Sequence, residues 1–299
     1  MLSLTRGCAM SEGTPAQLVW AKLKRSRPAM VGAILLGLFF FTALFAPWLA
    51  PDGPDDQNLH RRFQAPAITS AEGHFPFLLG TDNVGRDLLS RVILGARISL
   101  RVGFFAVAIS AVFGILLGAV AGYFGGVVES ITMRSMDIML AFPSILLAIA
   151  IVTVLGNSLT NAMIAVGIVG IPVFARLTRA AVLGVKSMDY VEAARAQGAS
   201  HARVLFVHVL PNCVNALIVQ ATLSTGTAVL DAAGLSFLGL GAKPPAPEWG
   251  TMLSDTFRYY ESAPWCVVAP GLAIMGMVLG FNLLGDGLRD ALDPRLKED

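Results

Sequence analysis

The most constraining feature of this sequence is a series of long apolar stretches. Six windows can be drawn, and most approach the roughly 20 apolar residues that a helix needs to cross a bilayer. Within lipid, a helix satisfies its own backbone N–H and C=O groups, so each window is expected to be helical. Asp231 and Gly234 interrupt the fifth window, and the fourth is short. The sequence therefore predicts an all-α membrane protein with six transmembrane helices, at residues 30–50, 102–123, 138–155, 161–175, 214–240 and 265–284.

Composition agrees with a membrane location. The 299-residue chain is 55% hydrophobic and 14% charged, against roughly 45–50% apolar and 25% charged residues in an average soluble domain. The formal net charge is only +2, and the basic residues are scattered rather than gathered into a stripe. Membrane lipid is therefore the expected surrounding partner, and a nucleic-acid partner is excluded.

The distribution of lysine and arginine predicts the orientation. If the N-terminus is cytoplasmic, the inside segments hold 14 of the 22 basic residues, as the positive-inside rule requires. The cluster Lys22, Lys24, Arg25 and Arg27 weighs most. Both termini are therefore expected in the cytoplasm.

This orientation divides the chain into parts. Residues 1–28 form a cytoplasmic N-terminal segment, residues 29–285 the six-helix transmembrane domain, and residues 286–299 a cytoplasmic C-terminal tail. Within the transmembrane domain, residues 51–101 form an external cap segment that is too short for an independent core, and residues 176–212 form a cytoplasmic loop.

Two shorter stretches carry structural expectations. The end of the cap segment, "LLSRVILGARISLRVG" from Leu88, spaces its apolar residues near the helical period, which predicts a helix lying at the membrane interface before the second window. The connection between the second and third windows is brief. Its Glu129, Arg134 and Asp137 are expected on a solvated or mutually paired loop surface.

The passage "VEAARAQGASHARVLFVHVLPN", residues 191–212, is unusually polar for this chain. Asp189 and Glu192 have the spacing of a capping box, which predicts a helix beginning at Tyr190. Gly198 can take the left-handed conformation that ends a helix, and Ser200 can cap a second helix that runs to Pro211. The passage therefore predicts two helices joined by a sharp turn.

The first of these helices would have a narrow surface. Ala193 and Ala194 project little beyond the backbone, while Glu192 and Arg195 place charge on the rim. A helix of this shape fits a groove on a partner protein. The alternative is a plain interfacial loop that satisfies only its own backbone.

This passage resembles the cytoplasmic loop of permease subunits of ATP-binding cassette (ABC) importers. The resemblance is carried by Glu192, Ala193 and Ala194, by Gly198, and by Pro211 after a leucine. Three further stretches, "LGTDNVGRDLLSRVILGARISL", "HVLPN" and "LSFLGLGAKPPAPEWGTML", together with "LRDALDPRL" near the end, resemble the dipeptide, oligopeptide and nickel permeases. The similarity is to the second of their two dissimilar membrane subunits, and it covers nearly the whole chain from about Val19.

The resemblance implies a fold, a location and a set of partners. The fold is that of a type I ABC importer permease with a cytoplasmic coupling helix, in a bacterial or archaeal plasma membrane. The partners are a homologous second permease subunit, two ATPase subunits and an extracytoplasmic substrate-binding protein. Dipeptides or oligopeptides are the favoured cargo, with glutathione-like compounds and nickel chelates as alternatives. The residues assigned to the ATPase-coupling loop are Asp189, Glu192, Ala193, Ala194, Arg195, Gly198 and Pro211.

The chain carries no recognisable catalytic motif. A phosphate-binding loop ending in Gly-Lys-Ser/Thr is absent, so ATP and Mg²⁺ are expected on the partner ATPase and no cofactor on this chain. The three cysteines and four histidines show no metal-ligand spacing. Catalytic residues and a metal site are therefore not expected. A passive channel or an integral-membrane enzyme is the rival class.

Asp231 is a candidate pathway residue. Members of the resembling family commonly carry a glutamate at the position of Ala232, whereas here the carboxylate lies one residue earlier, about 100° around the helix. Carboxylates inside a membrane are costly and usually functional. Asp231 therefore either lines the pathway or makes an internal or interfacial polar contact.

Overall fold

The computed structural model describes residues 15–67 and 77–292. Parts of three expected segments fall outside these residues: 1–14 of the N-terminal segment, 68–76 of the cap segment and 293–299 of the C-terminal tail. Almost every described stretch is helical, and within the described ranges the only β-pairing is an isolated bridge between Thr81 and Asp87.

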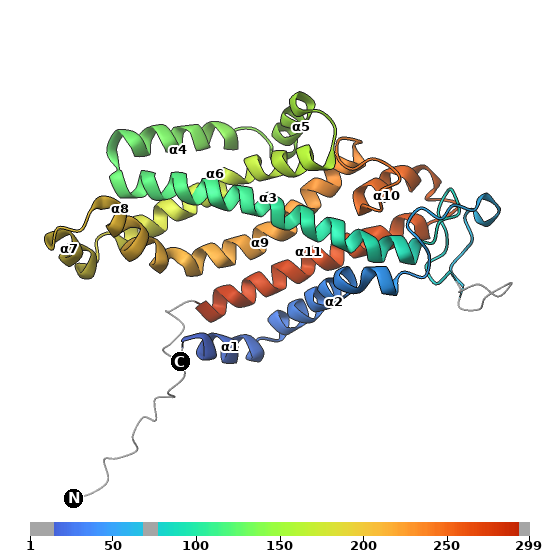
Figure 1. Ribbon diagram of the computed structural model, residues 1–299, viewed down its shortest axis with the longest axis horizontal. Helices are drawn as coiled ribbons and strands as arrows, with labels where there is room; N and C mark the ends of the chain where they lie inside the picture. The colour runs from blue at the N-terminus through green and yellow to red at the C-terminus, as the bar shows by residue number, and fades with distance from the viewer. Residues whose placement is uncertain (1–14, 68–76, 293–299) are drawn as a thin grey trace, which may run out of the picture.

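The helices form an elongated bundle (Figure 1). One end carries α7 and α8, and the opposite end carries α10 and the irregular segment before α3. The helices are α1 Pro15–Arg25, α2 Arg27–Leu49, α3 Leu88–Phe124, α4 Gly126–Leu140, α5 Ser144–Leu155, α6 Leu159–Val185, α7 Asp189–Ala196, α8 His201–Arg203, α9 Leu210–Phe237, α10 Trp249–Thr256 and α11 Trp265–Leu292, with a π-helical turn at Val204–Val209 and short 3₁₀ turns at Leu59–Arg61 and Phe257–Tyr259.

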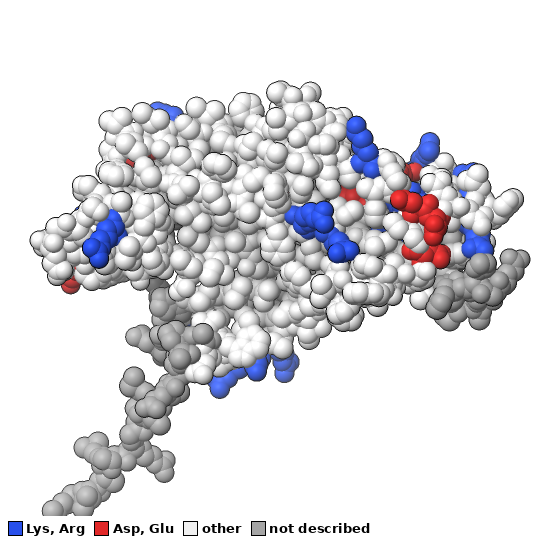
Figure 2. All heavy atoms as spheres, in the orientation of Figure 1, with Lys and Arg blue, Asp and Glu red and all other residues white. Residues whose placement is uncertain are grey.

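Five described helices are long and apolar enough to cross a membrane, and a sixth crossing results if α4 and α5 together form one broken span. Figure 2 shows that most of this face is white, with a blue patch near its middle and most of the red atoms toward the end opposite α7. The all-α fold with up to six spans is therefore confirmed. The five continuous spans are Arg27–Leu49, Leu88–Phe124, Leu159–Val185, His201–Phe237 and Trp265–Leu292.

The expected third span, 138–155, is not one helix. A bend of 94° separates α4 from α5. Pro143 precedes α5 with a ψ of 132°, outside the helical region, and its ring also disfavours a helical conformation for Phe142, the residue before it. With 12 residues, α5 is about 18 Å long and is too short to cross the roughly 30 Å bilayer core alone.

Three neighbouring expectations also change. Glu129 and Asp137 lie on α4 rather than on a loop, and they pair with Arg179 and Arg176 of α6. The stretch expected to lie at the interface is instead the start of α3, which continues unbroken for 37 residues. The fourth span extends well past Ala175, because α6 stays helical to Val185.

Helices α3 and α6 pack in unusually close contact. A Cβ atom added at Gly118 would lie 2.2 Å from the carbonyl oxygen of Ala175, and one at Gly114 would lie 2.4 Å from the Cβ of Phe174. The hydroxyl of Ser110 adds a hydrogen bond of 2.7 Å to the carbonyl oxygen of Gly167. Small residues at such positions let membrane helices approach closely. The pair α3 and α6 therefore forms the structural centre of the bundle.

A buried polar cluster holds the end of the bundle opposite α7. Arg91, only 1% exposed, donates hydrogen bonds to the carbonyl oxygens of Pro54 (2.8 Å) and Pro245 (3.1 Å). Arg86 pairs with Asp82 at 2.6 Å. The start of α3 thus ties the segment before it to the segment before α10.

Glu248 caps α10 from within the same region. Its carboxylate accepts hydrogen bonds from the backbone N–H groups of Gly250 (3.0 Å) and Thr251 (2.8 Å). Burial of the side chain raises the pKa of Glu248 above its ordinary value of 4.5, and the hydrogen bonds oppose that rise.

Candidate functional site

The loop after α6 folds as a helix, a sharp turn and a second helix. Helix α7 begins at Asp189, which is its first residue, while Met188 occupies the capping position without a side-chain hydrogen bond. The capping-box expectation for Asp189 and Glu192 is therefore wrong, because Asp189 is already inside the helix. Its carboxylate still lies in the first turn, where negative charge favours the helix dipole.

The turn itself matches expectation. Gly198 has a φ of +80°, in the left-handed region that a side chain disfavours. The side chain of Ser200 then accepts a hydrogen bond from the backbone N–H of Arg203 at 3.4 Å. Gly198 therefore ends the first helix and Ser200 caps the second.

The second helix does not end at Pro211. It continues from His201 through a π-helical turn into α9 and runs to Phe237 as one apolar span. Proline lacks an N–H group and its ring crowds the carbonyl four residues earlier. The widened turn at Val204–Val209 accommodates this crowding, and the side chain of Asn212 donates to the carbonyl oxygen of His208 at 2.8 Å. Pro211 lies in the first turn of α9.

One face of α7 is fixed to the bundle by apolar packing. Val191 has no exposed surface and packs in a cluster with Val182 of α6, Tyr123 of α3 and residues of the second helix, including Val204, Leu205 and Val209. The inward face of α7 therefore contacts the ends of three membrane helices.

Polar contacts to the end of α3 reinforce this attachment. The hydroxyl of Tyr123 lies 3.1 Å from Nδ1 of His201, and the guanidinium carbon of Arg195 lies 5.1 Å from the centre of the Tyr123 ring. Lys186 donates to the carbonyl oxygens of Gly122 (2.9 Å) and Tyr123 (3.3 Å). Sequence reasoning missed these partners because Tyr123 is 72 residues before Arg195 and no local pattern links them.

The outward face of α7 presents the sequence-predicted residues. Asp189, Glu192, Ala193 and Arg195 are exposed and Ala194 is half-buried. Among the described residues, neither Asp189 nor Glu192 forms an ion pair. The small alanine surface and the unpaired carboxylates are therefore available to another chain.

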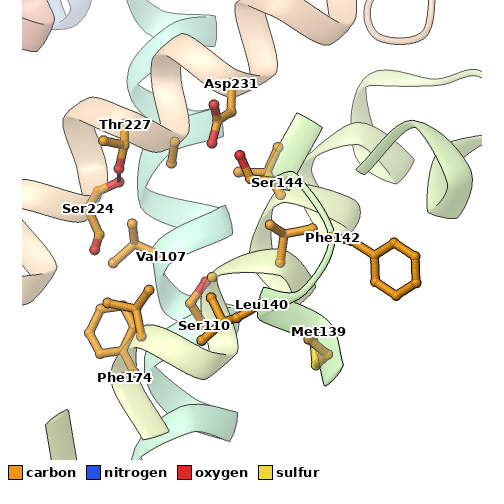
Figure 3. Close-up of a pocket in the computed structure, with 15 residues that line it drawn as sticks. Val107, Ser110, Met139, Leu140, Phe142, Ser144, Phe174, Ser224, Thr227 and Asp231 are labelled. Carbon is orange, nitrogen blue, oxygen red and sulfur yellow. Dashed lines mark hydrogen bonds between the residues drawn. The ribbon is translucent and has the colours of Figure 1, made fainter. Parts of the chain in front are cut away.

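A second candidate site is a partly open cavity of about 320 Å³ between helices of the bundle. Residues of α3, α6 and α9 line it, together with the bend between α4 and α5 (Figure 3). Asp231 points from α9 into this space, on the side that also holds Ser144 of α5. The other polar side chains in the wall are Ser110, Ser224 and Thr227.

Neighbouring positions on α9 have different surroundings. Asp231 is half-buried and lines the cavity, whereas Ala232 is 2% exposed and packs in an apolar cluster with Val107 and Leu235. Of these two positions, residue 231 is therefore the one that faces the cavity.

This arrangement defines a class of protein. A helical bundle with a short helix held at one end is the fold of type I ABC importer permeases. Two solved structures of the methionine ABC transporter MetNI, in inward-facing conformations, match it with TM-scores of 0.56 and 0.57 at 19% sequence identity. Each match covers 69% of this chain and 98% of the solved chain.

The chain belongs to the family of binding-protein-dependent transport system inner membrane components, whose model matches residues 114–298. A second model, the N-terminal transmembrane domain of oligopeptide transport permease C, matches residues 14–66. The chain is therefore a multi-pass inner membrane protein and a permease subunit of an ABC importer, as the sequence resemblance implied.

Curated relatives match along almost their whole length. The dipeptide transport system permease protein DppC of Alkalihalophilus pseudofirmus is 51% identical over 95% of this chain and 91% of its own. DppC of Escherichia coli K12 is 51% identical, with 95% of each chain covered. The glutathione transport system permease protein GsiD of Escherichia coli is 46% identical over 95% of this chain and 92% of its own.

Proposed function

We propose that this permease subunit forms half of a pathway for dipeptides or oligopeptides and that α7 is its coupling helix. The identity of about half to dipeptide permeases along 95% of the chain supports peptide cargo. The match to a glutathione permease keeps a glutathione-like compound as the second candidate, because glutathione is itself a peptide. Nickel chelates remain the third.

The attachment of α7 carries the coupling proposal. Val191 and Arg195 connect α7 to α3 through Tyr123, while Asp189 and Glu192 stay exposed. A partner protein that binds the exposed face of α7 and changes position will therefore displace the ends of α3, α6 and α9 together. Contacts of this kind shift a conformational equilibrium only if they differ between the two states.

The proposed function requires three kinds of partner and one orientation of the chain in the membrane. A homologous second permease subunit completes the pathway, two ATPase subunits bind ATP and Mg²⁺, and an extracytoplasmic binding protein delivers the cargo. The subunit itself has no catalytic role. The end with α7 faces the cytoplasm, together with both termini, because the inside segments hold the majority of the basic residues.

The test uses the complex reconstituted in liposomes with its ATPase subunits and binding protein. Glu192→Lys reverses a charge on the exposed rim of α7, so peptide uptake is expected to be lost while the subunit still inserts in the membrane. The matched control is Asp290→Lys, which also reverses an exposed carboxylate but lies on α11, outside the loop that contains α7. Uptake in Glu192→Lys equal to wild type would overturn the coupling role.

A passive channel is the rival reading. A channel predicts ion conductance from the purified chain alone, whereas the importer predicts uptake only with ATP and the partner subunits. Copurification of this chain with a nucleotide-hydrolysing subunit distinguishes the two.

A further inference from the structure

Among the described residues, Asp231 is the only ionisable one that lines the 320 Å³ cavity. Within the described part of the chain, its carboxylate has neither an ion pair nor a hydrogen-bond donor. The nearby charges on α4 and α6 behave differently, because Arg176 pairs with Asp137 and Arg179 with Glu129. Asp231 is therefore the one carboxylate of this region that lacks a partner within the described chain.

An unpaired carboxylate among apolar helices is expensive. Charged groups cost free energy when they leave water unless an opposite charge or several donors replace the hydration. A ligand that brings a positive charge into the cavity removes this cost, whereas an anionic ligand increases it. A carboxylate at this position therefore favours a cationic ligand over an anionic one.

The hydroxyl groups of the wall add to this preference. Ser110 donates its proton to the carbonyl oxygen of Gly167 (2.7 Å), and Thr227 donates to that of Ser224 (3.0 Å). These two hydroxyls can therefore only accept a further hydrogen bond. Ser224 differs, because its hydroxyl oxygen accepts from the side chain of Gln220 (2.9 Å) and its proton stays free to donate. Asp231 and the two acceptor hydroxyls present lone pairs to the cavity, and an ammonium group supplies three donors and no acceptor.

We propose that the cavity is a transit site for the ammonium group of a peptide, with Asp231 as its counter-ion. The inference rests on the proposed function and names the part of the cargo that the membrane subunit itself recognises. A volume of about 320 Å³ lies at the lower end of the range for small-molecule sites, which is enough for the N-terminal end of a peptide.

The test measures binding of dialanine and N-acetyl-dialanine to the assembled complex without its binding protein, which removes the discrimination that protein would add. Wild type is expected to bind dialanine at least 10-fold more tightly than the acetylated form, which has no ammonium group. Asp231→Asn is expected to lose this preference and Asp231→Glu to keep it. Asp286→Asn, which removes an exposed carboxylate of α11, is the matched control and is expected to bind like wild type.

Equal binding of the two peptides to wild type, or an unchanged preference in Asp231→Asn, would overturn the inference. ATPase activity stimulated by the binding protein separates this failure from failure of the proposed function. That activity is measured on wild type and on Asp286→Asn, and its presence in both shows that the coupled complex is assembled. A wild-type complex that hydrolyses ATP but imports no peptide contradicts the proposed cargo instead.

Discussion

The guanidinium group of Arg195 lies over the ring of Tyr123, 5.1 Å from its centre, and so joins the short helix α7 to the last turn of α3. An exposed cation–π contact is worth about 0.5–1 kcal/mol. The same tyrosine meets His201 through its hydroxyl at 3.1 Å. One aromatic side chain therefore connects α3 with both helices of the proposed coupling loop.

Removal of the ring is expected to weaken coupling more than removal of its hydroxyl. Tyr123→Ala deletes the surface under Arg195 and part of the cluster around Val191, so peptide uptake per ATP hydrolysed should fall severalfold. Tyr123→Phe keeps that surface and loses only the contact with His201. Uptake and ATPase rates measured on the same proteoliposomes give the ratio. Equal ratios in the two variants would count against a role for the ring.

Gly198→Val is expected to distort the turn after α7. The φ of +80° costs a residue with a side chain about 1–2 kcal/mol, and a β-branched residue is among the least tolerant. Uptake should be strongly reduced, and Gly198→Asn should be milder because asparagine tolerates this conformation. Gly184→Ala is the control, since a Cβ there meets no atom within 4 Å. Variants that rank in any other order would show that the turn conformation is unimportant.

Gly118→Val is expected to prevent close packing of α3 and α6. A Cβ at this position would already lie 2.2 Å from the carbonyl oxygen of Ala175, so the helices must separate. The yield of folded subunit after detergent extraction should fall sharply. Gly37→Ala on α2, where a Cβ meets nothing within 4 Å, should extract normally. Normal extraction of both variants would contradict this packing.

The polar cluster around α10 is expected to become more stable in mild acid. Burial raises the pKa of Glu248 above 4.5 and that of Asp87 and Asp255 above 3.8. The folded state therefore binds these protons more tightly than the unfolded state. The resulting stabilisation is complete when the pH lies below the ordinary pKa values of these carboxyl groups. It is lost as the pH rises through their raised pKa values in the folded protein.

Hydrogen exchange of the backbone amides in α10 measures this effect. With intrinsic rates corrected for pH, protection should increase as the pH falls from 7 toward about 4.5. Glu248→Gln cannot titrate and keeps one acceptor oxygen, which can replace the contact with Gly250 or with Thr251 but not both, so its protection should be lower at every pH and should depend less on pH. If protection in Glu248→Gln depended more steeply on pH than in wild type, protonation of Glu248 would not be what stabilises α10 in acid.

The lengths of the apolar stretches in the sequence predicted most of the transmembrane helices. Windows of apolar residues indicate membrane helices because lipid imposes that requirement on every residue of a span. The break between α4 and α5 was missed because the apolar run continues across Pro143, and composition alone does not show where a proline redirects the chain. The ends of α3 and α6 were missed because helices continue beyond the membrane when tertiary packing supports them.

Local chemistry predicted the coupling loop only in part. Gly198 and Ser200 act through their own backbone and their nearest neighbours, so their roles were visible in the sequence. Asp189 was assigned one position outside the helix, since a carboxylate favours both the cap and the first turn. The contacts of Tyr123 depend on helices that meet only in the folded bundle.

The helix from His201 to Phe237 is one continuous element along the bundle. His201 contacts Tyr123 near the coupling helix, and Asp231, 30 residues further on, faces the cavity about 45 Å away. A displacement at one end of this helix is transmitted to the other end through continuous backbone. The π-helical turn at Val204–Val209 is where the helix is expected to bend first. One helix would then link ATP hydrolysis on the partner subunit to the binding of a cationic ligand at Asp231.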